Sequence, residues 1–287
     1  MRFEKWQALG NDYVIVEERE LPFELTPARV RALCAPHTGI GSDGVLLIRE
    51  IDGDRLKPVP IPVAEVRIYN PDGSEAELSG NGVRQAAMYL RRNGWTDRDS
   101  FSVRTAAGEI RPRIEGDLCT LDIGRVRLHA EGDYPGGAED GTGTLISDGR
   151  EFAFQFVQVG NPQVSIEVGD GLEELDLQRY GPGIERNELF PNRTNVSFWG
   201  RTGDAEIRAR IFERGVGETM ASGTGATGAA VAAALRGVDS PVTVVLDGGE
   251  LVVDVGEDMH VHMTGWARPV YAGTLSEEFV KELNATE

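Results

Sequence analysis

Two short motifs in the chain each place a serine hydroxyl beside a potential anion-binding helix N-terminus. The sequence reads SGNG from Ser79 and SGTG from Ser222, and each phrase runs into a stretch of helix-forming residues. The first turn of a helix leaves backbone N–H groups unpaired, and the helix dipole favours a negative charge there. If both helix starts held one small carboxylate, Ser79 and Ser222 would lie on opposite sides of the bound carbon. That geometry suits removal of a proton from one face and return of a proton to the other.

Helix capping is the plain alternative for each phrase. Serine is a preferred N-cap residue, and the glycines could simply allow a tight turn. The two phrases, however, belong to a longer repeat without gaps, in which residues 69–82 match residues 212–225 at a constant offset of 143 (222 − 79). Aromatic residues coincide within it, as do Glu75 and Glu218 and the serines themselves. The repeat favours a shared functional role over two unrelated caps.

A second repeated phrase predicts that the chain consists of two related halves. Gly10-Asn11 and Gly160-Asn161 each precede a segment with the alternation of a strand. Similar alternating segments between turn residues predict many more short strands, and helices are expected only at 26–33, 82–93, 225–236 and 276–283. The sequence therefore predicts an α+β protein formed by an internal duplication, with its boundary near residues 122–133.

The composition limits the class of partner and cofactor. The net charge of −18 argues against nucleic acid and anionic membranes as partners. Cysteine is scarce, and the segment that starts at Met1 does not resemble a signal peptide, so we expect a soluble, cytoplasmic protein. Two GxGxxG matches, from Gly39 and Gly223, do not follow a strand within a βαβ unit, and no P-loop phrase is present. No nucleotide cofactor is expected.

His260 and His262 form the one pattern that suggests a pair of metal ligands. They are spaced i, i+2 on a predicted strand, so both side chains could face the same side of a sheet. The nearby sequence offers no obvious third ligand. We therefore predict no metal site and no cofactor.

Several longer phrases, in order along almost the whole chain, resemble the diaminopimelate epimerase family. They are ALGNDYVIVE from Ala8, LCAPHTGIGSDGVLLI from Leu33, RIYNPDGSEAELSGNG from Arg67, VGNPQVSI from Val159, RTNVSF from Arg193 and ERGVGETMASGTGATGAA from Glu213. Members of this family are cofactor-independent amino-acid epimerases of lysine and peptidoglycan precursor synthesis. The resemblance therefore implies an isomerase with a small amino-acid substrate, acting as a homodimer.

The resemblance also implies an architecture. Two pseudo-symmetric halves would each wrap a mixed sheet around a central helix, with the active site in the cleft between them. We place the halves at residues 1–124 and 125–265, with residues 266–287 returning to the first half.

A set of substrate ligands follows from the same resemblance. Arg214 would hold a carboxylate with two parallel hydrogen bonds, and Glu213 would suit an ammonium group. Asparagine amides both donate and accept, so they would fix the orientation of the substrate. The implied ligands are Asn11, Asn70, Asn161, Asn195, Glu213 and Arg214, together with the residues after the serines, Gly80, Asn81, Gly223 and Thr224.

The catalytic positions are where this chain departs from the family. The family has cysteines where this chain has Ser79 and Ser222, and a histidine where it has Gln163. A thiol has an ordinary pKa near 8.5 and can be brought into the working range, whereas a serine hydroxyl is a far weaker acid. Some members also have a glutamine where this chain has Gly44. The two cysteines, Cys34 and Cys119, are expected to be structural and not to replace the missing thiols.

Three readings of the function remain open from the sequence. The first is an epimerase of LL-diaminopimelate or a close amino acid that uses Ser79 and Ser222 as catalytic residues, with Glu213 best placed to polarise Ser222. The second is an isomerase of the same fold with a different proton shuttle, as in the phenazine-pathway isomerases that resemble this fold and use carboxylates. The third is an amino-acid-binding protein without catalysis. The retained ligand set favours the first reading, whereas the loss of both thiols and of the histidine favours the other two.

Overall fold

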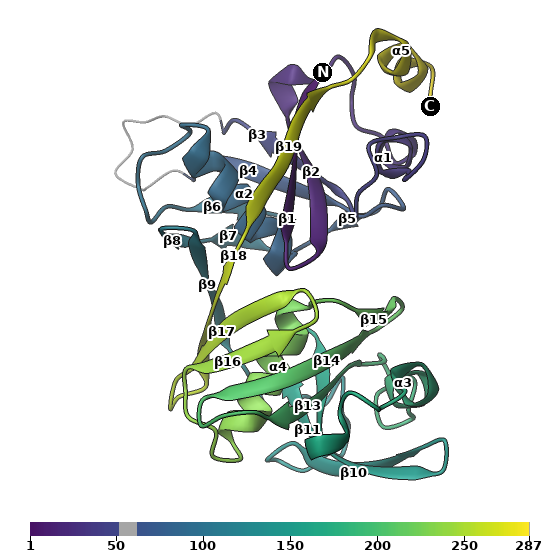
Figure 1. Cartoon of the computed structure of the whole chain (residues 1–287), viewed down its shortest axis with the longest axis vertical. Coiled ribbons are helices and arrows are strands. Elements are labelled where there is room, and N and C mark those ends of the chain that lie inside the picture. Colours follow the sequence, from purple (N-terminus) through teal and green to yellow (C-terminus); the bar gives the residue numbers. More distant parts are fainter. Residues whose placement is uncertain (52–61, 287) are drawn as a thin grey trace. The chain divides into compact units, whose positions relative to one another are not determined.

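The computed structural model describes residues 1–51 and 62–286, which form two compact units (Figure 1). One unit consists of residues 1–121 and 265–287, and the other of residues 122–264. The chain therefore passes from one unit to the other twice, once after Leu121 and once after Thr264. Of the described helices, none is long and apolar enough to span a membrane.

The first unit is built on a mixed sheet around the helix α2 (Gly80–Arg92). The strand order is β19-β1-β2-β3-β4-β6-β7, with β5 paired to β4; the pairs β2–β3 and β4–β6 are parallel. Helix α2 packs against β1 to β4 and β19, and Val83, Ala86 and Leu90 on it are fully buried. The strands are β1 (Arg2–Ala8), β2 (Asn11–Glu17), β3 (Val45–Arg49), β4 (Ala64–Tyr69), β5 (Glu75–Ala76), β6 (Val103–Thr105), β7 (Gly108–Ile110) and β19 (Arg268–Thr274).

Two further helices of this unit pack on each other. Helices α1 (Pro27–Cys34) and α5 (Glu277–Ala285) share a core in which Val30, Leu33 and Leu283 are buried. The Arg29 side chain on α1 donates hydrogen bonds to the carbonyl oxygens of Leu283 and Asn284. The C-terminal helix is thereby held against the first unit.

The second unit repeats this plan around the helix α4 (Gly223–Ala234). The strand order of the sheet around this helix is β10-β11-β12-β13-β14-β16-β17-β18-β9-β8, with β15 paired to β14. Helix α4 packs against β11 to β14, β16 and β17. As expected for a helix in the middle of a core, five of its alanines are fully buried: Ala226, Ala229, Ala230, Ala232 and Ala233. The strands of this sheet are β8 (Arg113–Glu115), β9 (Leu118–Arg125), β10 (Thr142–Ser147), β11 (Arg150–Gln158), β12 (Pro162–Glu167), β13 (Asn195–Arg201), β14 (Glu206–Glu213), β15 (Gly217–Thr219), β16 (Val242–Leu246), β17 (Gly249–Val255) and β18 (His260–Trp266). Of these, β8 and the start of β9 lie within residues 1–121, which are counted in the first unit.

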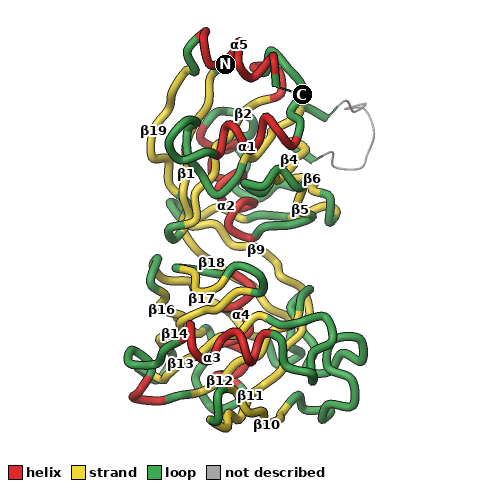
Figure 2. Tube along the Cα trace, turned by 90° about the vertical axis from the view of Figure 1, so that its right-hand side faces the viewer, coloured by secondary structure: helices red, strands yellow, loops and turns green. Residues whose placement is uncertain are grey.

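The internal duplication predicted from the sequence is visible in the pairing of the strands. In the first unit β2 and β3 are parallel, β4 pairs with β3 and β5, and α2 follows before the parallel partner β6. In the second unit β12 and β13 are parallel, β14 pairs with β13 and β15, and α4 follows before the parallel partner β16. Figure 2 shows α4 among the strands β12, β13, β14 and β16 that it contacts. The predicted α+β fold of two related halves, each with a mixed sheet around a central helix, is confirmed.

Two local details differ from the sequence-based expectation. Helices α2 and α4 begin at Gly80 and Gly223, two residues earlier than predicted, so the glycines form the first turn. Helix α3 (Leu177–Glu185) was not predicted because it contains Gly181, Pro182 and Gly183, which are poor helix formers. A side chain at position 181 would lie 2.5 Å from the Phe212 ring, so close tertiary packing explains the glycine and outweighs its low helix propensity.

Candidate active site

Ser222 is the N-cap of α4 and is joined to an acidic side chain. Its Oγ atom accepts a hydrogen bond from the Gly225 N–H at 3.3 Å and donates one to Glu213 Oε2 at 3.1 Å. Glu213 ends β14, and Thr219 on the neighbouring β15 donates a second hydrogen bond to its Oε1 atom at 2.8 Å. The β14–β15 hairpin therefore holds a carboxylate against the serine at the helix start. Ser222 is therefore both a helix cap and the hydrogen-bond partner of a carboxylate.

Burial raises the pKa of Glu213 above its ordinary value, while the hydrogen bonds from Thr219 and Ser222 partly oppose the rise. A carboxylate in such surroundings is a stronger base than one in water, because fewer contacts stabilise its charge. Glu213 is thus able to accept a proton that passes through the Ser222 hydroxyl.

The predicted ligands of the second unit lie around two adjacent strand starts. Asn195 begins β13, and its amide accepts a hydrogen bond from the Arg214 backbone N–H at 2.8 Å and donates one to the Pro162 carbonyl at 3.4 Å. Asn161, just before β12, accepts a hydrogen bond from the Gln163 amide at 2.6 Å. Asn195 therefore ties the turn after Glu213 to the start of β12. The Arg214 side chain is exposed and donates to the Asn192 carbonyl at 2.8 Å.

Ser79 occupies the equivalent place in the first unit but has a different partner. It is the N-cap of α2, and its Oγ atom accepts a hydrogen bond from the Gly82 N–H at 3.0 Å. The Tyr13 hydroxyl on β2 donates to the same oxygen at 3.4 Å. The residue at the repeat position of Glu213 is Asn70, which bonds to Ser74 instead. One serine is therefore paired with a carboxylate and the other with a phenol.

The remaining predicted ligands of the first unit also surround the start of α2. Gln85 on α2 donates to the Asn11 carbonyl at 3.0 Å, and the Asn11 amide donates to Asp43 at 3.0 Å. Asn81 is buried, and its amide oxygen accepts from Arg84 at 2.6 Å. The backbone N–H of Asn81 is therefore better suited to bind a ligand than its side chain, whose oxygen is already hydrogen-bonded.

Glu75 and Glu218, the acidic pair of the repeat, do not reach the serines by hydrogen bonds. Each forms an ion pair with an arginine on the strand that it follows: Arg67 with Glu75 at 2.7 Å, and Arg210 with Glu218 at 2.6 Å. The two ion pairs are equivalent in the repeat and brace the two hairpins that precede the helices. We assign them a structural role.

Gly44 leaves space for the residue that contacts Ser79. A Cβ atom at this position would lie 2.2 Å from the Tyr69 carbonyl oxygen and 2.6 Å from the Tyr13 ring. A side chain larger than glycine does not fit beside Tyr13 in this conformation.

Substitution of Gly44 by alanine is expected to destabilise the protein by about 1–3 kcal/mol, because the new methyl group meets backbone that cannot move cheaply. Equilibrium unfolding in denaturant measures the change. Gly171→Ala is the matched control, since a Cβ atom there meets nothing within 4 Å. Equal stability of the two variants would contradict the packing argument.

The sequence alone did not reveal the partners Tyr13 and Thr219. A signal for Tyr13 existed, because the Gly-Asn phrases align Tyr13 with Gln163, where the resemblance described above implies a histidine. Thr219 lies beside Glu213 only because β15 turns back along β14. Cys34 and Cys119 are buried, and burial raises the pKa of both thiols, that of Cys119 to about 12. Neither thiol is activated.

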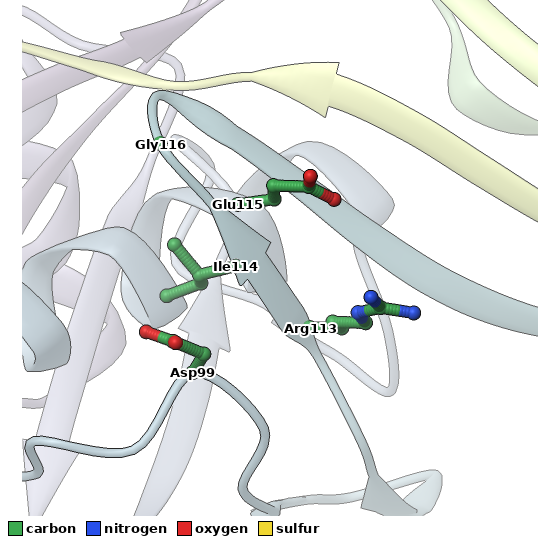
Figure 3. A pocket seen from close by; sticks show the side chains of 5 residues that line it. All are labelled: Asp99, Arg113, Ile114, Glu115 and Gly116. Carbon is green, nitrogen blue, oxygen red and sulfur yellow. The ribbon is translucent and has the colours of Figure 1, made fainter.

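A cavity of about 330 Å³ in the first unit is separate from these residues (Figure 3). It is lined by Asp99, Arg113, Ile114, Glu115 and Gly116, on and around β8. None of them is a predicted site residue or a contact of Ser79. We therefore do not assign the substrate to this cavity.

Comparisons with known proteins agree with the fold. The diaminopimelate epimerase family model matches residues 3–129 and 155–270. The diaminopimelate epimerase of Synechococcus sp. (strain JA-3-3Ab) is 40% identical over 96% of this chain and 99% of that protein. That of Desulfitobacterium hafniense is 38% identical over 97% of this chain and 99% of that protein. A solved structure of a Bacillus anthracis phenazine biosynthesis protein has the same fold, with a TM-score of 0.67, 16% identity and coverage of 96% and 99% of the two chains.

The fold, the paired helix starts and these relatives together define the protein as an isomerase of the epimerase class. More specifically, the chain belongs to the diaminopimelate epimerase family.

Proposed function

We propose that this protein inverts the α-carbon of LL-diaminopimelate, or of a closely similar amino acid, by two-base proton transfer without pyridoxal phosphate. The observation that carries the proposal is the pair of equivalent N-cap serines, each hydrogen-bonded to a second group that can carry a proton. The retained ligand set and the identity to named epimerases support the substrate class.

Each helix start offers backbone N–H groups that suit the substrate's α-carboxylate. In α2 the N–H groups of Gly82 and Val83 are bonded to Ser79, which leaves those of Gly80 and Asn81 without a partner inside the helix. In α4 the N–H groups of Gly223 and Thr224 are in the same position, since those of Gly225 and Ala226 bond to Ser222. These N–H groups favour a negative charge, and more so as charge builds up during removal of the α-proton.

Proton removal is assigned to the half that contains Glu213. The α-C–H bond breaks, and its electron pair stays on the substrate beside the carboxylate. The proton moves to Ser222 Oγ while the serine's own proton moves to Glu213 Oε2, so the serine remains neutral. This relay avoids a free serine alkoxide, which would be hardly populated near neutral pH.

Proton return is assigned to the half that contains Tyr13. The Ser79 hydroxyl gives its proton to the carbanion, and Tyr13 passes its phenolic proton to Ser79 Oγ. Hydrogen bonds from Tyr13 and the Gly82 N–H to this oxygen make its proton easier to lose. Proton exchange with water restores the protonated Tyr13 and the ionised Glu213. The reverse reaction uses the same groups in the opposite roles.

Incubation with LL-diaminopimelate in D₂O tests the proposal, with the α-proton followed by NMR. We expect exchange and epimerisation that fall by about 10²–10⁴-fold in both Ser79→Ala and Ser222→Ala. Ser276→Ala is the matched control, because Ser276 caps α5 through the Phe279 N–H and has no part in the reaction. All three variants lose a cap, so they should lose similar stability, and only the first two should lose exchange.

Two other results would replace the proposal. Saturable binding of the amino acid without exchange in the wild-type protein would make it a binding protein. Exchange with unsaturated carboxylic acids, but not with amino acids, would favour a same-fold isomerase with Glu213 as its shuttle, for which the raised pKa of Glu213 and the absent thiols are the supporting observations.

A further inference from the structure

Three potential metal ligands meet on the outer face of two neighbouring strands in the second unit. Asp122 lies on β9, and His260 and His262 lie on β18, next to β9 in the sheet. One ligand atom from each residue lies within 4.8 Å of the others. The sequence did not indicate Asp122 as a third ligand, because it is 138 residues from His260 in the chain.

The sheet holds the three side chains in a common orientation. His260 and His262 alternate with Val261 and Met263, which are buried, so both imidazoles point away from the core. Their ring centroids are 5.1 Å apart, and the His260 Nε2 atom lies 2.7 Å from Asp122 Oδ1. The Gly124 N–H donates to the same carboxylate at 2.8 Å and fixes its direction.

A second carboxylate flanks the group from the other side. Asp254 on β17 is directly opposite His262 in the antiparallel register, and directly opposite residues have Cβ atoms about 4.5–5.5 Å apart. Two imidazoles with one or two carboxylates match the ligands of zinc and its neighbours in the periodic table. Ca²⁺ and Mg²⁺ prefer sites made only of oxygen ligands.

We propose that Asp122, His260 and His262 form a binding site for a divalent transition-metal ion, with Zn²⁺ as the best match. Three protein ligands leave a fourth position for water. The site is independent of the proposed epimerase chemistry, since it contains none of the residues assigned to that reaction.

A metal ion bound at this position should also stabilise the fold. The chain leaves and re-enters the first unit after Leu121 and Thr264, on the same two strands that supply the ligands. A bound ion would join β9 to β18 through side chains, in addition to their backbone pairing. Binding to the folded chain alone should therefore raise its melting temperature.

Titration of the untagged, chelator-treated protein with Zn²⁺ in a calorimeter tests the site. We expect about one equivalent to bind, and His260→Ala and His262→Ala each to weaken binding by at least about tenfold. Asp122→Asn should also weaken it, although the amide oxygen can still accept hydrogen bonds from Gly124 and His260. That variant separates metal binding from the local hydrogen bonds.

The other histidines provide the matched control. His129 has a carboxylate neighbour, Glu131, at 3.6 Å, and His37 is exposed. The double variant His37→Ala/His129→Ala should bind Zn²⁺ like the wild-type protein and show the same rise in melting temperature. Wild-type protein without saturable binding, or binding lost only in this control, would overturn the proposal. So would binding that persists unchanged when both His260 and His262 are replaced.

Discussion

Replacement of Glu213 by glutamine is expected to lower the rate of α-proton exchange by about 10²–10⁴-fold, the usual contribution of a positioned general base. Glutamine has nearly the same shape, but its amide cannot take up the proton that Ser222 passes on. Glu213 accepts hydrogen bonds from both Thr219 and Ser222, and an amide has only one acceptor oxygen to offer them. NMR of the substrate α-proton in D₂O measures the rate.

Thr219→Val is the matched control for this prediction. It removes one hydrogen bond to Glu213 and leaves the carboxylate in place, so its loss of rate should be much smaller. If Glu213→Gln exchanged the α-proton as fast as the wild-type protein, Glu213 would not be the base in either proposed reaction.

The pH dependence distinguishes a lost base from a damaged fold. Burial raises the pKa of Glu213 in the folded protein, so between the unfolded and folded pKa values the folded state binds more protons. This group's contribution to the free energy of unfolding is therefore greatest at low pH and falls as the pH rises through the folded pKa. Exchange should rise over the same range, as the carboxyl group ionises. Glu213→Gln should lose both dependences and be at least as stable as the wild-type protein near pH 7.

The sequence predicted those parts of the molecule that are encoded locally or by the repeat. Alternating strands and serine caps are patterns of neighbouring residues, and the 143-residue offset is a repeat visible in the sequence itself. Helices α2 and α4 begin within the predicted motifs. Helix α3 escaped prediction because its stability depends on distant packing, with Leu177 and Ile184 buried in the aromatic core around Phe190. Local propensity carries no information about such contacts.

The contacts of the candidate sites also differ in whether the sequence could predict them. Ser222 and Glu213 lie close together in the chain and were correctly suspected to interact, since β14 runs directly into the hairpin that precedes α4. The Tyr13–Ser79 contact and the Asp122–His260 contact join residues 66 and 138 positions apart. Only the strand order brings these pairs together, and a single sequence does not determine that order.

The double substitution Ser79→Cys/Ser222→Cys is expected to raise the rate of α-proton exchange by about 10²-fold or more, within the range that a well-matched acid and base contribute. A thiol at a helix N-terminus is far more acidic than a hydroxyl at the same position. The surrounding groups are already in place: each position has a capping N–H, Ser222 has Glu213 and Ser79 has Tyr13. The exchange assay in D₂O gives the rate, and an alkylating reagent should abolish the gain.

The control for the double variant is Ser276→Cys, which places a thiol at the N-terminus of α5, a different helix from those that Ser79 and Ser222 cap. It should react with the reagent but leave exchange at the wild-type rate. The buried Cys34 and Cys119 should contribute neither to the reaction with the reagent nor to the exchange rate. A double variant without any gain would mean that acid strength at these two positions does not limit the reaction. The serines would then belong to a site whose substrate loses its proton more readily than an ordinary amino acid, and the unsaturated carboxylates would become the substrates to test.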